Sequence, residues 1–167
     1  MIVGLAKFLG NGVSRNCPAK RLMTPDMNTD RLCFQGVVMI SKVICLATAG
    51  AVGTVFRYFL GGFVHRFVDA DFPWGTLSVN ALGCFLAGFL WIFSERSLAI
   101  SGELRAVIFI GFFGAFTTFS SVMLETAELL RAAEWAASFK NIMFHNVLGI
   151  GLVVLGIVAA KSLKGGV

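Results

Sequence analysis

The sequence has little charge and little proline. Charged side chains make up 14% of its 167 residues, and proline occurs only three times. Soluble globular domains contain about 25% charged residues. Hydrophobic residues reach 57%, and long uncharged runs recur along the chain. This composition excludes an ordinary soluble domain and places the chain in the membrane-protein class.

Motifs for catalysis and for nucleic-acid binding are also missing. No H-E-x-x-H or G-x-S-x-G pattern occurs, and the four cysteines form no C-x-x-C pair. Such scattered cysteines indicate small apolar fillers rather than metal ligands or disulfides. No basic stripe with interleaved aromatic residues is present. We therefore expect neither an enzyme nor a nucleic-acid-binding protein.

Four apolar stretches predict four transmembrane helices, because a helix of about 20 residues crosses a bilayer. The stretches are Ser41–Val64, Trp74–Phe93, Arg105–Thr126 and Asn141–Ala160. Short connections join them, and the last of these, Ala127–Lys140, is itself predicted to be helical with a polar face. The expected fold is thus an all-α membrane protein of four helices. One such subunit offers little wall for a solute path, so we expect an oligomer.

Residues 1–38 differ from the rest. They hold five of the 14 Lys and Arg residues, two of the three prolines and no spanning run. A signal peptide is not expected, because only Met1–Gly10 is apolar and Lys7 interrupts it. We predict a dispensable N-terminal extension, which is either disordered or lies upstream of a true start at Met39. Residues 39–167 would form the membrane domain.

The basic residues of that domain are nearly balanced between the two sides of the membrane. If the four spans alternate, one side carries Lys42, Arg96, Arg105, Lys161 and Lys164, and the other carries Arg57, Arg66, Arg131 and Lys140. Lys and Arg in short loops set orientation. So small a bias permits insertion in both orientations and pairing as an antiparallel dimer, although a weak bias can also fix one orientation.

The third stretch contains a segment that disfavours a continuous helix. The run Gly111–Ser121 holds two glycines, two threonines and two serines, in the middle of the uncharged stretch Ala106–Leu124. These residues are poor or middling helix formers. A broken membrane helix is tolerated where its backbone faces protein or a wet cavity, and such breaks commonly mark ion sites. We therefore predict a third helix broken at mid-membrane, beside an ion site.

Several polar residues lie inside the predicted spans. Arg57 either extends to the interface or attracts anions. Asn80 shares a helix face with Thr76 and either joins helices or solvates an ion. His145 is either proton-sensitive or held by a neighbouring helix. Glu125 lies near the end of the third span, and no carboxylate occupies the first half of any span, which counts against proton-coupled drug transport.

Three motifs together resemble the Fluc/CrcB family of fluoride channels. They are Gly50-x-x-Gly53-x-x-x-Arg57-Tyr58, then Gly75-Thr76-Leu77-x-Val79-Asn80-x-x-Gly83, then Gly111-Phe-x-Gly114-x-x-Thr117-Thr118-Phe119-Ser120. The resemblance covers residues 39–163. It implies a bacterial inner-membrane channel for passive export of fluoride, built as an antiparallel, dual-topology homodimer with two pores. It also implies a sodium ion at the dimer centre, bound by the backbone carbonyls of Gly114 and Thr117.

The resemblance further assigns roles to side chains. The pore-lining residues would be Thr76, Asn80, Phe119, Ser120, Ser121, Glu125 and His145, and Arg57 would lie in the vestibule. Two positions depart from the family pattern: Val122 replaces a second pore phenylalanine, and His145 replaces a hydroxyl. We predict that protonation of His145 changes conductance. The alternatives are a small multidrug-type transporter and a non-transporting membrane scaffold.

Overall fold

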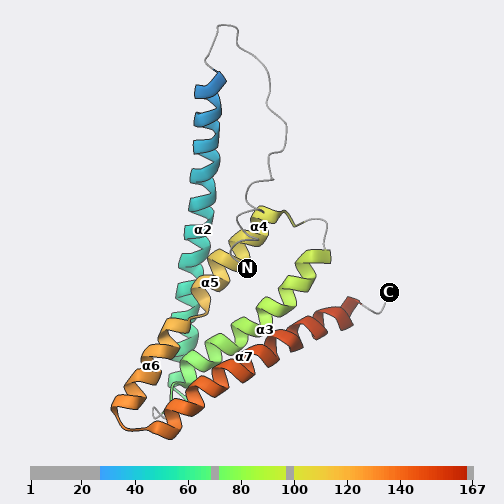
Figure 1. The fold of residues 1–167 in the computed structure, drawn as a ribbon. Helices are drawn as coiled ribbons and strands as arrows, with labels where there is room; N and C mark the ends of the chain where they lie inside the picture. The colour runs from blue at the N-terminus through green and yellow to red at the C-terminus, as the bar shows by residue number, and fades with distance from the viewer. Residues whose placement is uncertain (1–26, 69–71, 97–99, 165–167) are drawn as a thin grey trace.

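The computed structural model describes residues 27–68, 72–96 and 100–164, and within these ranges every regular element is helical (Figure 1). Side chains are described from Met39 onward. The elements are α2 (Met27–His65), α3 (Trp74–Arg96), α4 (Gly102–Ala106), the π-helix η1 (Val107–Phe112), α5 (Phe113–Phe116), α6 (Phe119–Arg131) and α7 (Trp135–Lys164).

The described residues contain four segments long and apolar enough to cross a membrane, as predicted. They are Met39–His65, Trp74–Glu95, Gly102–Arg131 and Trp135–Leu163. The predicted extension lies largely outside the described residues. Since α2 begins at Met27, the backbone of residues 27–38 is helical, and the role of residues 1–38 stays a prediction.

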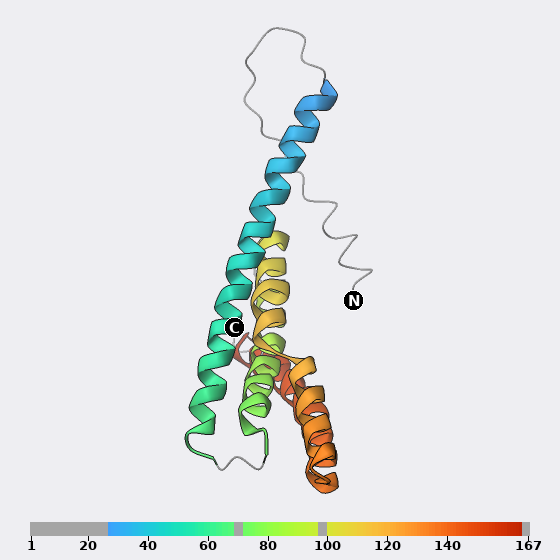
Figure 2. The ribbon, with the colours of Figure 1, turned by 90° about the vertical axis from the view of Figure 1, so that its left-hand side faces the viewer.

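The helices pack mainly as two pairs. One pair is α2 with the first half of the third span, η1 and α5, and the other is α3 with α7 (Figures 1 and 2). In the second pair, a Cβ added at Gly88 would overlap the Val153 carbonyl, and one at Gly156 would overlap the Phe85 carbonyl. Small residues thus let the two backbones approach closely, which stabilises helix pairs in lipid.

The third span is interrupted inside the predicted run. The helix ends at Phe116, and Thr117 (φ −85°, ψ 153°) and Thr118 (φ −146°, ψ 119°) adopt extended conformations. A new helix, α6, begins at Phe119 and diverges from α2 toward the start of α7 (Figure 2). The two halves of this span therefore have different partners, α2 for the first and α7 for the second.

The connection between the third and fourth spans is much shorter than predicted. Residues 127–131 continue α6 and residues 135–140 begin α7. Most of Ala127–Lys140 is therefore helical, as predicted, but its helical residues belong to the two spanning helices and not to the connection. The turn is a Schellman motif: the Ala133 N–H donates to the Leu130 carbonyl (3.1 Å) and the Glu134 N–H to the Leu129 carbonyl (2.9 Å). Ala133 occupies the left-handed position (φ 59°).

Candidate functional site

The break in the third span is held by a side chain from α3. The Asn80 Nδ2 donates to the Thr118 carbonyl (3.0 Å), and the Thr118 N–H donates to Asn80 Oδ1 (2.8 Å). One amide thereby pairs with both backbone groups of an extended residue. Asn80 joins two helices, which is one of the two roles that its position predicted.

A second side chain caps the helix that follows. Thr118 Oγ1 accepts from the Ser121 N–H at 3.2 Å, as an N-cap residue does. The same hydroxyl lies 3.2 Å from Ser120 Oγ and 3.1 Å from Ser121 Oγ. The break thus gathers three hydroxyl groups at the N-terminus of α6, where the helix dipole is positive.

These two bonds divert N–H groups from carbonyls of the preceding turn. In a continuous α-helix, the N–H of a residue bonds to the carbonyl four residues earlier. The Thr118 N–H would serve Gly114 and the Ser121 N–H would serve Thr117, but Asn80 and Thr118 Oγ1 accept these donors instead. Gly114 and Thr117 are the two residues expected to coordinate sodium. Their released carbonyl oxygens fit a hard cation, which prefers oxygen ligands.

Phe119 begins α6 and is 72% exposed in the protomer, so its ring is available to a pore or to another subunit. The ring lies next to the hydroxyl cluster in sequence, as the predicted pore requires. Val122, at the position of the second expected ring, is only 2% exposed. In this protomer it is a packing residue, and its carbonyl serves as an acceptor.

A second polar cluster lies between α3, α6 and α7. The Thr76 hydroxyl donates to Glu125 Oε1 across the α3–α6 contact. Asn141 of α7 is fully buried, and its Nδ2 donates to Thr126 Oγ1 (2.9 Å) and to the Val122 carbonyl (3.3 Å). The ring Nδ1 of His145 lies 2.9 Å from the Asn141 carbonyl. Three predicted pore residues, Thr76, Glu125 and His145, therefore belong to one cluster.

This cluster contains buried polar atoms without a partner in the protomer. Within the described residues they are Glu125 Oε2, Asn141 Oδ1 and His145 Nε2. Buried polar atoms are normally hydrogen-bonded, so three such atoms together indicate a site that receives something. Asn141 had no predicted role of its own. The feature of the sequence that could have identified Asn141 is its spacing of four residues from His145, which places both on one helix face.

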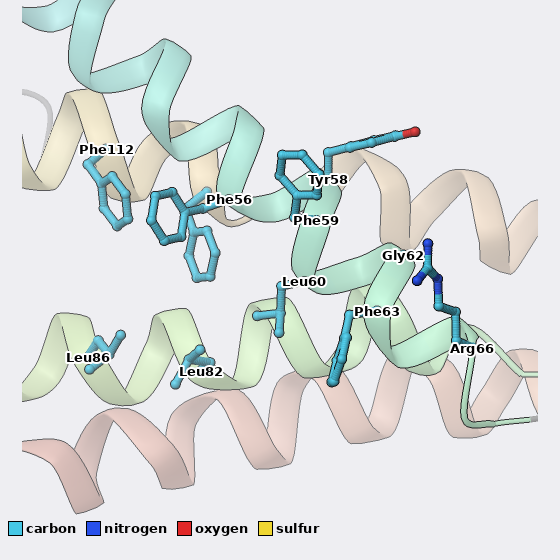
Figure 3. Close-up of a pocket in the computed structure, with 11 residues that line it drawn as sticks. Phe56, Tyr58, Phe59, Leu60, Gly62, Phe63, Arg66, Leu82, Leu86 and Phe112 are labelled. Carbon is cyan, nitrogen blue, oxygen red and sulfur yellow. The ribbon is translucent and has the colours of Figure 1, made fainter.

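Arg57, expected in a vestibule, is partly buried on α2. A groove of about 870 Å³ beside it runs between α2, α3 and the first half of the third span (Figure 3). Its lining is mainly aromatic and aliphatic, with Arg66 at one end: Phe56, Tyr58, Phe59, Leu60, Gly62, Phe63, Arg66, Leu82, Leu86, Phe112 and Phe116. The structure does not place Arg57 in this lining.

Comparison with known proteins decides the family. The sequence model described as CrcB-like protein, Camphor Resistance (CrcB), matches residues 44–157. The chain belongs to the CrcB family. It is 49% identical over 123 residues to a protein of Desulforapulum autotrophicum named fluoride-specific ion channel FluC, covering 74% of this chain and 98% of the relative. A Nitrosococcus oceani protein of the same name is 46% identical over 118 residues, covering 71% and 94%.

A third relative, from Solidesulfovibrio magneticus, bears the same name and is 41% identical over 123 residues, covering 74% of this chain and 98% of its own length. Relatives of this kind and the four apolar helices make the chain a multi-pass bacterial membrane protein. The match begins at residue 44, so it lies within the predicted membrane domain. The family is one of channels rather than enzymes.

Proposed function

We propose that this protein is a fluoride-selective channel that allows passive export of fluoride from the cytoplasm. The observation that carries the proposal is the 49% identity, over 98% of its length, to a relative named as a fluoride-specific ion channel. The geometry supports it. The break held by Asn80 lies just before α6, and the hydroxyl cluster and the second polar cluster follow it along that helix. Such a succession of polar groups suits an ion whose hydration shell must be replaced by protein groups.

We propose that the functional unit is an antiparallel homodimer with a sodium ion between the two breaks. The residues of this chain that would bind the ion are Gly114 and Thr117, through carbonyl oxygens whose helical donors are bonded elsewhere. The small Lys and Arg bias supports insertion in both orientations. A cation at the centre lowers the electrostatic cost of a nearby anion.

Fluoride must exchange its hydration shell for protein donors, yet it must also leave. The hydroxyls of Ser120 and Ser121 are neutral donors, and the ring edge of Phe119 carries partial positive charge. A track of neutral donors replaces water without binding the anion as tightly as a fixed cation would. This satisfies the requirement of conduction for both entry and exit.

The test is ion efflux from liposomes that contain the purified protein. Liposomes loaded with fluoride should lose it rapidly, while liposomes loaded with chloride should keep their ion. Phe119→Ile, which removes the ring edge at similar bulk, should reduce fluoride efflux. Equal loss of both halides, or loss of neither, would refute the channel. Drug uptake driven by a pH gradient would instead indicate a transporter.

A further inference from the structure

The hydrogen bond of His145 fixes which ring nitrogen carries its proton. Nδ1 lies 2.9 Å from the Asn141 carbonyl oxygen. A carbonyl oxygen can only accept, so Nδ1 must be the donor. In the neutral ring, Nε2 then holds a lone pair and no hydrogen. Nε2 is buried and has no partner among the described residues.

Glu125, which interacts electrostatically with His145, also has a buried atom without a partner. Glu125 Oε1 accepts from Thr76, whereas Glu125 Oε2 is buried without a donor. The charged or titratable groups that act electrostatically on Glu125 are His145 of α7, His65 of α2 and Glu128 of its own helix. Cys84 of α3 lies beside Gly149, which follows His145 by about one turn of α7. The Nε2 atom of neutral His145 and the Oε2 atom of ionised Glu125 are therefore both acceptors that no donor among the described residues reaches.

A fluoride ion is also an acceptor only, so it cannot bond to neutral Nε2. Protonation turns Nε2 into a donor that can bond to fluoride, because the imidazolium carries a hydrogen on both nitrogens. We propose that His145 and Glu125 form a linked proton–fluoride site, at which His145 takes up one proton from solution when fluoride binds and returns it when fluoride leaves. This inference rests on the proposed function and specifies how one of its pore residues works.

Glu125 makes such a site reversible. Its carboxylate offsets the positive charge of the imidazolium, so the pair offers an N–H donor without a net positive charge. Because a full cationic site would hold the anion too firmly, the neighbouring carboxylate keeps the exit of fluoride possible. His65 is the other histidine of the chain, and its ring packs over Gly75 at the end of α2. It has no buried, unpartnered nitrogen in the protomer.

The proposal makes a quantitative prediction for the apparent affinity. If only the protonated form binds fluoride at this site, the apparent dissociation constant equals the intrinsic one divided by the protonated fraction. Half-saturating fluoride should then rise about tenfold per pH unit where free His145 is neutral and stay constant where it is protonated. Efflux from liposomes should be measured over a range of fluoride concentrations, with the same pH on both faces, between about pH 5 and pH 9, which brackets the ordinary histidine range.

Two variants form the matched comparison. His145→Ser replaces the ring with a hydroxyl that donates at every pH, so its half-saturating fluoride should be independent of pH. His65→Gln removes the other histidine near Glu125 and should keep the dependence of the parent. If His65→Gln abolishes the dependence and His145→Ser keeps it, the site is at His65 and the proposal is wrong.

A binding measurement separates this inference from the proposed function. Calorimetric titration with sodium fluoride, repeated in buffers of different ionisation enthalpy, counts the protons taken up per fluoride bound. At a pH where free His145 is neutral, the parent should take up about one proton per fluoride, and His145→Ser should take up none. Fluoride binding without proton uptake would overturn the inference, even if efflux remains selective for fluoride. Loss of that selectivity would overturn the proposed function. The number of protons taken up per fluoride bound would still show whether His145 forms the linked site.

Discussion

The two halves of the third span are positioned by different kinds of contact. The first half, η1 and α5, packs against α2 and is apolar, and there a Cβ added at Gly53 would overlap the Phe112 carbonyl. The second half, α6, is positioned by hydrogen bonds from side chains: Thr118 caps it, Thr76 bonds to Glu125, and Asn141 bonds to Thr126. Asn80 joins α3 to the extended residues between the halves.

This difference shows how a broken helix is stabilised in lipid. Unsatisfied backbone groups are costly in hydrocarbon, so a break needs substitutes for the helical bonds that it loses. The first half needs only close packing, because its own backbone is helical. At the junction, Asn80 and Thr118 accept from the N–H groups and leave the carbonyls available. Packing therefore places the break, and specific polar side chains decide which backbone atoms it releases.

The largest expected effect comes from the close-packed half. Gly53→Val should destabilise the fold by about 3 kcal/mol, the upper end of the usual overpacking cost, because its Cβ meets the backbone of both Phe112 and Phe116. Thermal unfolding of the detergent-solubilised protein measures this. Gly62→Ala is the control, since nothing lies within 4 Å of a Cβ at Gly62. Equal losses in both variants would mean that close packing on α2 does not position the first half.

The next largest effect is expected at Asn80, whose amide joins α3 to the break. Asn80→Leu removes both hydrogen bonds between Asn80 and the Thr118 backbone and should cost about 2 kcal/mol, roughly 1 kcal/mol for each bond. It should also abolish any rise in melting temperature that sodium produces, since the Thr118 N–H can then return to the Gly114 carbonyl. Asn80→Asp keeps the acceptor and should keep the response to sodium. An equal response in both variants would contradict the role given to Asn80.

A smaller effect is expected at the cap of α6. Thr118→Val preserves shape but removes the acceptor of the Ser121 N–H, and should cost about 1 kcal/mol of stability. Amide hydrogen exchange should become faster in the first turn of α6 and stay unchanged in η1. Thr118→Ser retains a hydroxyl and should behave like the parent. Faster exchange in η1 as well would show that the two halves are not held independently.

Much of this arrangement could be predicted from the sequence, and the reasons differ by residue. The four spans follow from uncharged length, and the break follows from the small and hydroxyl residues between Gly111 and Ser121. The bond between Asn80 and Thr118 could not be predicted, because it joins residues 38 positions apart through a tertiary contact. The same holds for the contact between Thr76 and Glu125, which depends on how α6 diverges after the break.

The short turn before α7 was missed for a local reason. Glu, Leu and Ala favour helix throughout residues 127–137, so no glycine or proline signals where the chain reverses. Ala133 takes a left-handed conformation that usually belongs to glycine. Ala133→Gly should therefore stabilise the protein, by about 0.5–1 kcal/mol, and is the smallest effect expected here. An unchanged or lower melting temperature would contradict this explanation of the turn.

The central claim is that two diverted N–H groups leave the Gly114 and Thr117 carbonyls free for a cation beside the fluoride path. A high-resolution experimental structure of the dimer in sodium solution tests it most directly. We predict a single spherical density coordinated by these two carbonyl oxygens of each protomer, with the Thr118 N–H bonded to Asn80. A continuous third helix, with the Thr118 N–H bonded to the Gly114 carbonyl and no density at the dimer centre, would contradict the account.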